Sequence, residues 1–552
     1  MLRAGHLLSL LALAGPLRAQ LGAPNVPNEN PITEEKRILG KLLFWEEQLS
    51  SDNTMSCGTC HQVYAGGADD RFARHYGRDD EFYTYDDFYG SRGVRPSTSS
   101  GEFTFTGDLL TETSHQVVQR NSMSFFMAAY NKELMWDGRV TEEFVDPETG
   151  AVLIPSEGAL EGQALGPILS EVEMAYPERT WDDVRQKLTG ARPMALAMDL
   201  PPDMAAAVAG GATYPELFED AFGDSEITAA RIAFAIATYE RTLIPDETPW
   251  DLFKAGDSAA LTPAQQSGEQ LFKTTARCNL CHEPPTFTDD RFHNIGLRPP
   301  LDDKGRYHVT HDFDDMGRFK TPSLRNVSLK PRIFHTGRQP EFLGPAYQGL
   351  VHHGKSLVAR AMTVYVLGGG PHPGNLSSFI LPLPDLSDND VDDIVDFLEN
   401  GLTDPRARDG AFPFDSPTLF STSKERGIQY VQGGTPGRGG RLPELIVEAP
   451  PVVHGGEFRL GVIGARPGSL GWVSVQPVKR SGGSSGETSP WDLQDPLFNS
   501  SPAFVDGKAT WQAELPLDTN LIGHELDVCW CFYDDSVVSR ISMTRTVRLT
   551  VH

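Results

Sequence analysis

The sequence has no hydrophobic run long enough to cross a membrane as a helix. Its N-terminal apolar run, Leu7 to Ala14, is much shorter than the ~20 residues that such a helix needs. Arg3 precedes this run and Leu17-Arg18-Ala19 follows it, as in the charged start and small-residue cleavage site of a secretory signal peptide. We therefore predict a signal peptide over residues 1–19 rather than a buried N-terminal helix, and a soluble, periplasmic mature protein.

Positive charge is also scarce. The 552 residues include 48 Lys and Arg against 75 Asp and Glu, which gives a net charge of −27. Such acidity argues against binding to nucleic acid or to anionic lipid, because both are negatively charged. It favours a basic partner in transient encounters, or it serves only as a solubilising surface.

Cysteine is rare, and four of the six residues belong to two Cys-X-X-Cys-His motifs. In this pattern the cysteines form thioethers with the vinyl groups of haem c, and the histidine becomes the proximal iron ligand. Two such motifs behind an export signal predict two covalently bound haem groups, and therefore redox chemistry, electron transfer or both. The residues are Cys57, Cys60 and His61 in the first motif and Cys278, Cys281 and His282 in the second.

The other two cysteines, Cys529 and Cys531, lie two residues apart on a predicted strand and so point to the same face. This spacing orients them poorly for a disulfide. A structural zinc site needs four ligands, and no second pair is free. We therefore predict that both side chains are structural and buried.

The chain divides into successive regions. A largely helical region around the first motif covers 30–245, and a second one around the other motif covers 246–405. A turn-rich linker over 406–441 is rich in glycine and proline, and a region of alternating strands covers 442–552. The predicted fold class is mainly α: two cytochrome c-like haem domains followed by a C-terminal β-sandwich.

Local patterns support these assignments. Apolar residues from Ile232 to Leu243 recur at helical spacing, and Ser387 with Asp390 forms a capping box before an apolar stripe that Gly401 ends. Period-two segments follow the linker and predict strands. They are Phe458–Ile463, Gly471–Val478, Ala509–Leu517, Leu526–Phe532 and Val537–Val551.

Several ordered motifs between residues 32 and 402 resemble those of bacterial dihaem cytochrome c peroxidases. The same family includes MauG, which matures a tryptophan-derived quinone cofactor in another protein. The terminal β region lies outside the resemblance. The motifs are Leu39 to Trp45 with Leu49-Ser50, Arg120-Asn121-Ser122, Trp136 to Arg139, Gln163 to Pro167, Glu171 to Met174, Phe319 to Val327 and Phe334 to Gly337.

The resemblance implies a division of labour between the two haems. The haem on His61 reacts with hydrogen peroxide, and the haem on His282 receives electrons one at a time from a carrier. It also implies that Glu173 is the acid/base for cleavage of the O–O bond and that Gln163 orients the peroxide. Trp136 falls where the family keeps a tryptophan between the haems, as an electron relay or as a ring packed on a haem edge.

The sequence leaves more than one candidate for the distal ligand of each haem iron. His115 is the nearest candidate for a removable ligand on the first haem, with His75 on a polar loop as a weaker one. If neither histidine binds the iron, the first haem already has a free coordination position for peroxide. For the second haem the resemblance favours Tyr365, as in MauG-like members, while Met362 one turn earlier would supply the sulfur of typical peroxidases. Met316 is a third candidate.

Members of the family often bind calcium between the haem domains. Asn121 matches the side-chain ligand there, and the carbonyl groups near Lys330 and Arg332 match the backbone ligands. Dimers are common in the family, so the resemblance also allows a homodimer.

Three functions remain as hypotheses. The leading one is a periplasmic peroxidase that reduces hydrogen peroxide with electrons from a small c-type cytochrome or cupredoxin. The second is a MauG-like enzyme that uses peroxide to oxidise a protein or organic substrate, with the β region as a dock. The third is a non-catalytic electron-transfer module, which would have no use for Gln163 and Glu173.

Overall fold

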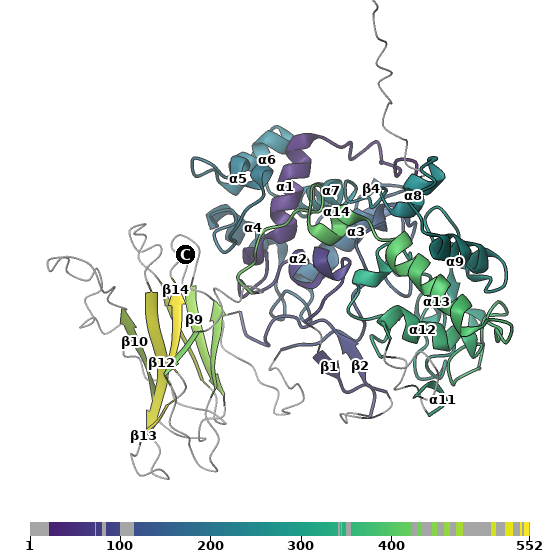
Figure 1. Ribbon diagram of the computed structural model, residues 1–552. Helices are drawn as coiled ribbons and strands as arrows, with labels where there is room; N and C mark the ends of the chain where they lie inside the picture. Colours follow the sequence, from purple (N-terminus) through teal and green to yellow (C-terminus); the bar gives the residue numbers. More distant parts are fainter. Residues whose placement is uncertain are drawn as a thin grey trace, which may run out of the picture.

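The computed structural model describes residues 21–71, 73–79, 84, 86–99, 115–339, 343, 345–348 and 355–421, together with strands between 429 and 550. The predicted signal peptide lies outside these residues. The part before residue 422 is mainly helical, as predicted, and its helices form two groups around two separate apolar cores (Figure 1). In the described residues, no helix is both long and apolar enough to span a membrane.

The first group is built on a close pair of helices, α1 (Glu34–Trp45) and α7 (Ala229–Glu240). Gly40 makes their contact possible, because a Cβ atom there would lie only 1.8 Å from the Ala235 carbonyl oxygen. The helix predicted from Ile232 onward is α7. The other helices of the group are α2 (Cys57–Cys60), α3 (Ala159–Leu165), α4 (Trp181–Gly190), α5 (Pro202–Ala207) and α6 (Tyr214–Phe222).

The second group also contains a close pair of helices that a glycine makes possible. Helix α9 (Pro263–Lys273) packs on α13 (Asp388–Asp396) through Gly268, where a Cβ atom would lie 2.0 Å from the Asp393 carbonyl oxygen. The capping box of Ser387 and Asp390 is present, and a π-helical turn carries the chain on to Gly401. The other helices are α8 (Pro249–Lys254), α10 (Tyr307–Thr310), α11 (Pro345–Gln348) and α12 (Leu357–Val366).

Short antiparallel pairs of strands brace the loops between these helices. They are β1 (Ala73–His75) with β2 (Phe88–Gly90), β3 (Phe144–Val145) with β4 (Val152–Ile154), and β5 (Phe292–His293) with β6 (Phe319–Lys320).

After the second group the chain returns to the first. In Figure 1 the green helix α14 (Pro405–Asp409) lies among the purple and blue helices of the first group. Phe414 is fully buried there, with its ring 5.0 Å from that of Phe126. Asp415 pairs with Lys41 at 2.9 Å. Residues 406–421 of the predicted linker are therefore packed on the first haem domain, because their apolar side chains complete its core.

Strands follow the return segment, as the period-two pattern predicts. One sheet has the order β10-β12-β14-β7, with β13 paired to β12, and the other has the order β11-β9-β8. Stacking of the two sheets as a sandwich stays a prediction, and the side chains of Cys529 and Cys531 lie outside the described part. The strands are β7 (Gln429–Gln432), β8 (Glu444–Ala449), β9 (Glu457–Ile463), β10 (Gly471–Pro477), β11 (Ala509–Glu514), β12 (Glu525–Tyr533), β13 (Ile541–Met543) and β14 (Thr546–Thr550).

Candidate active site

The first Cys-X-X-Cys-His motif forms the short helix α2 and the residue that follows it. Ser56 and Thr59 cap this helix reciprocally. Gly58 lets it lie against Trp45, because a Cβ atom there would lie 2.1 Å from the indole ring. The His61 ring contacts the Gly67 carbonyl through Nδ1 at 3.1 Å. With Nδ1–H donating to this carbonyl, Nε2 is left as the nitrogen that can bind iron.

The second motif has the same local design. The turn over Cys278–Leu280 leads to Cys281 and His282, and His282 Nδ1 contacts the Phe287 carbonyl at 3.1 Å. Burial lowers the pKa of His282 to about 4, so the imidazole is neutral and its Nε2 lone pair is available. Both histidines thus have the same backbone-anchored Nδ1, an arrangement that suits the predicted role of proximal ligand.

A large cavity opens beside His282. It encloses about 1530 Å³ of space, part of it open to solvent, and its lining is mostly apolar. Cys278 and Cys281 line it together with His282, so the two predicted thioether positions and the predicted iron ligand border the same space. An apolar cavity with this donor set fits a covalently bound haem.

Two candidate distal ligands, Met362 and Tyr365, line this cavity from α12. They lie three residues apart on one helix face, so both can approach the same position. Met362 is buried, and burial next to Cys281 and Cys278 raises the pKa of Tyr365. Met316, the third candidate, is not among the residues that line the cavity.

Glu173 lies in the turn that follows Gly166–Leu169, close to the first attachment site. Burial raises the pKa of Glu173, against an opposing hydrogen bond with Ser170. Burial also raises the pKa of Cys57 to about 12, and the carboxylates of Glu240 and Glu173 add to this rise. Glu173 is therefore near the first haem position, with a carboxyl group that can hold a proton at higher pH than usual.

Gln163 lies near the end of α3, on the segment that leads into the Glu173 turn. Its side chain is partly exposed. Among the described residues, no hydrogen bond joins the Gln163 side chain to Glu173. The two predicted residues thus lie on one continuous segment, and among the described residues no hydrogen bond joins their side chains.

His115 is anchored on the same side as Glu173. Its Nδ1 contacts the Gly93 carbonyl at 2.8 Å, and Gly93 in turn lies against the Glu173 backbone, since a Cβ atom at Gly93 would lie 2.9 Å from the Glu173 Cα. Burial, with the positive charge of Arg95, lowers the pKa of His115 well below its usual value. The imidazole is therefore neutral, as an iron ligand must be. His75 instead accepts from the Gly77 N–H and stacks on Tyr76.

Trp136 occupies the boundary between the two haem domains. Its indole N–H donates to the Asn121 carbonyl at 2.7 Å, and the ring lies 6.2 Å from that of His335. The residue lines the His282 cavity and also a smaller space bordered by Met123 and Met127 of the first domain. This position is consistent with both predicted roles, a relay and a ring packed beside a haem.

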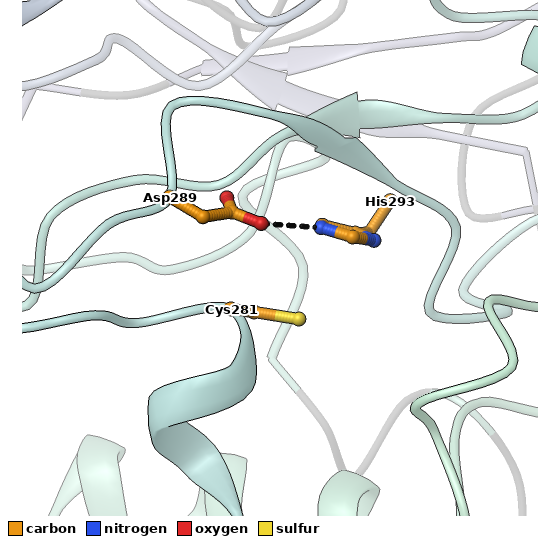
Figure 2. A group of neighbouring side chains, drawn as sticks. All are labelled: Cys281, Asp289 and His293. Atoms are coloured by element: carbon orange, nitrogen blue, oxygen red, sulfur yellow. Dashed lines mark hydrogen bonds and ion pairs between the residues drawn. The ribbon is translucent and has the colours of Figure 1, made fainter.

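Sequence reasoning missed a polar pair beside the second motif. His293 Nε2 lies 2.8 Å from the Asp289 carboxylate, and Figure 2 shows both side chains above Cys281. Burial alone would lower the pKa of His293, but Asp289 and Cys281 raise it to about 9. Cys281 belongs to the haem motif, so we read the group as a charged pair at the haem edge and not as a metal site. The four-residue spacing from Asp289 to His293 could have revealed it.

Asn121 and Lys330, two of the residues predicted to hold calcium, both line the His282 cavity. The Asn121 side-chain amide already donates to the Phe334 carbonyl at 3.2 Å. Lys330, whose carbonyl was a predicted ligand, lines both the His282 cavity and the smaller space beside it. Burial lowers the pKa of Lys330 to about 8. Calcium binding by Asn121 and these carbonyls stays a prediction.

A family model and several known proteins match this chain. Residues 34–259 match the model of the family described as di-haem cytochrome c peroxidase. The methylamine utilization protein MauG of Methylophilus methylotrophus is 30% identical over 315 residues, covering 56% of this chain and 71% of that protein. Cytochrome c551 peroxidase of Pseudomonas aeruginosa is 30% identical over 317 residues, covering 56% and 69%.

A second MauG protein, from Methylorubrum extorquens, is 28% identical over 400 residues, covering 72% of this chain and 86% of that protein. Peroxidases and MauG proteins thus match the same chain at similar identity. The chain belongs to the family of dihaem cytochrome c peroxidases and MauG proteins, and it is an oxidoreductase with two haem groups.

Proposed function

We propose that the chain is an exported, periplasmic peroxidase with two covalently attached haems. It reduces hydrogen peroxide to two water molecules, taking up two protons and two electrons from a small c-type cytochrome or cupredoxin. The haems supply an iron that accepts a peroxide oxygen and a store for the second electron. The observation that carries the proposal is the partly buried Glu173 carboxyl beside the first attachment site.

The chain's own residues then have distinct tasks. Glu173 takes the proton from the peroxide oxygen nearer the iron and returns it to the departing oxygen. Gln163 donates a hydrogen bond that orients the peroxide. His115, neutral and anchored on Gly93, would hold the first haem as a removable ligand only in a protein that is gated by reduction. Trp136 bridges the two domains on the electron path.

Replacing Glu173 tests the proposal directly. Glu173→Gln keeps the size of the side chain but removes the proton carrier, so we expect peroxide turnover to fall by about 10²–10⁴-fold. Glu171→Gln is the matched control, because Glu171 is exposed two residues earlier. Steady-state peroxide consumption should be measured on proteins whose optical spectra show both haems. Wild-type turnover in Glu173→Gln would remove this residue from the mechanism.

A second function is favoured by Tyr365. A phenolate ligand on the second haem would stabilise ferric and higher states, whereas the Met362 thioether would favour ferrous iron. With Tyr365 facing the cavity, the chain is also suited to use peroxide as an oxidant for a protein or organic substrate, as its MauG relatives suggest. No donor is then required for the first reaction with peroxide.

A further inference from the structure

The segment from Phe334 to Gly337 contains a buried histidine that the proposed mechanism does not use. His335 is only 4% exposed and lines the His282 cavity. Its ring stacks on that of Phe319, with the centroids 3.6 Å apart and the planes 10° from parallel. The Trp136 ring lies 6.2 Å away at 65°, which is an edge-to-face contact. The imidazole thus contacts both a phenyl ring of the second haem domain and the predicted relay of the first.

An acidic side chain holds this imidazole from its edge. Asp303 is also 4% exposed, and its Oδ2 lies 3.4 Å from His335 Nε2. Within the described part of the chain, neither of these two atoms has another hydrogen-bond partner. The other oxygen of Asp303 pairs with Arg120 at 2.6 Å, and the Arg120 guanidinium lies 5.5 Å from the Phe319 ring. Asp303 therefore orients the imidazole through Nε2, while Phe319 supports its face.

The backbone fixes Trp136 to the same group of residues. The Trp136 indole N–H donates to the Asn121 carbonyl at 2.7 Å, and the Asn121 N–H donates to the His335 carbonyl at 3.0 Å. In addition, the Trp136 carbonyl accepts from the Lys320 N–H at 2.8 Å. Asn121 thus connects Trp136 to His335 through two consecutive hydrogen bonds. The orientation of the indole is therefore coupled to His335 both by ring contact and through the backbone.

This arrangement is more specific than the filling of a space requires. A buried imidazole and a buried carboxylate each cost free energy that an apolar side chain of similar size would not. The group lies at the boundary of the two haem domains, where Trp136 lines the spaces of both. Precise placement matters on an electron path, because a displacement of about 1 Å can slow a reaction by about 10²-fold.

We propose that His335, held by Asp303 and Phe319, is a positioning residue that keeps the Trp136 indole in the orientation in which it carries electrons between the two haems. The inference rests on the relay role that the proposed function gives to Trp136. His335 acts through the indole and serves neither as an acid or base nor as an iron ligand.

The rate of electron exchange between the haems tests this role. A radiolysis pulse adds one electron to the fully oxidised, haem-loaded protein, and the optical spectra of the two haems report its redistribution without peroxide. His335→Ala should slow this redistribution by about 10–10²-fold. His335→Phe keeps a ring that can stack on Phe319, so it should keep most of the rate. A wild-type rate in His335→Ala, or a His335→Phe variant as slow as His335→Ala, would overturn the assignment.

A double-mutant cycle with Trp136→Phe separates positioning from a general structural effect. If His335 acts through the indole, His335→Ala should have little further effect in the Trp136→Phe background. An equally large effect in both backgrounds would contradict the proposal. A wild-type rate in Trp136→Phe would remove the relay itself, and the inference with it. A slow Trp136→Phe variant beside a fast His335→Ala variant would overturn the positioning role alone.

Two further variants control for folding. Phe218→Ala empties a fully buried position of α6, far along the chain from Trp136, so it should lower stability yet leave electron exchange at the wild-type rate. Phe319→Leu covers the case in which His335→Ala does not bind both haems. It keeps an apolar side chain but removes the flat surface on which the imidazole stacks, so redistribution should again slow. An unchanged rate in Phe319→Leu, or a slow one in Phe218→Ala, would count against the positioning role.

Discussion

At the scale of single residues, the choice between Tyr365 and Met362 decides the reactivity of the second haem. We expect Tyr365 to be the ligand. Tyr365→Phe should then change the ferric optical spectrum and raise the potential of the second haem, whereas Met362→Leu should leave the spectrum unchanged. Fully oxidised wild-type protein should react promptly with one equivalent of hydrogen peroxide, and Tyr365→Phe should not. A wild-type protein that reacts only after partial reduction would instead indicate methionine ligation and a gated first haem.

His293 gives a second prediction, in the pH dependence of stability. Its pKa is raised to about 9 in the fold by Asp289 and Cys281, against an ordinary value near 6.5. Between about pH 6.5 and 9 the folded state therefore holds a proton that the unfolded chain has lost, so the stabilisation is fully present only below about pH 6.5. This stabilisation should disappear as pH rises through about 9.

Urea unfolding at several pH values measures the effect. The difference in unfolding free energy between wild type and His293→Gln should shrink over this range, by at most about 3 kcal/mol, since one pKa unit corresponds to about 1.4 kcal/mol. Thioether formation removes the Cys281 thiolate contribution, so the holoprotein should show the smaller change. A difference that grows with pH would contradict the assignment of the proton to His293.

The sequence makes some of these residues predictable and others not. The haem attachment residues follow from the local spacing of the Cys-X-X-Cys-His motifs, and the neighbouring Asp289–His293 spacing is equally local. Lys330 differs, because only the packing of distant segments reveals that it lines the His282 cavity and the smaller space beside it. Gln163 and Glu173 were predicted from the family motif alone. A Gln and a Glu ten residues apart do not by themselves indicate a catalytic site.

At the scale of elements, the segment from α14 to residue 421 ties the C-terminal end of the second haem domain to the first domain. Glu47 accepts hydrogen bonds from the backbone N–H groups of Phe420 at 2.8 Å and Ser421 at 3.0 Å. Arg406 pairs with Asp246 at 2.7 Å, at the junction of the two domains. The segment thus acts as a strap whose removal would open the first core.

The buried Phe414 is the apolar anchor of this strap. Phe414→Ala should lower the free energy of unfolding by about 3–5 kcal/mol, because the substitution leaves a cavity in the first core. Phe313→Ala is the control, since Phe313 is 75% exposed and should change stability by no more than about 0.5 kcal/mol. Chemical denaturation of both variants provides the comparison. Equal stabilities would mean that the strap is not part of the folded core.

Helical elements were easier to predict than the strap. The apolar face of α7 and the capping box of α13 are encoded within a dozen residues, so both could be predicted from periodicity and caps. The strap is short, rich in turn residues and has one buried aromatic ring, which makes it look like a linker. Its place is decided by contacts with Lys41, Glu47 and Phe126, all more than 250 residues earlier in the chain.

At the scale of the whole molecule, the excess of acidic residues bears on the electron donor. A net charge of −27 creates a negative field that attracts a basic partner and repels an acidic one. The proposed reaction needs two separate electron deliveries for each peroxide, so the donor must dock and leave repeatedly. Long-range attraction speeds each encounter without requiring a tight complex.

Ionic strength should therefore control the rate with protein donors. With a basic reduced cytochrome, kcat/KM for the donor should fall by about tenfold or more as salt is raised, because screening shortens the reach of the field to about 8 Å at physiological ionic strength. With an uncharged small reductant the rate should hardly change, which separates donor encounter from peroxide chemistry. A rate with the basic donor that is independent of salt would mean that the acidic surface only maintains solubility. A rate that rises with salt would mean that the docking face around the second haem is itself basic, despite the charge of the whole chain.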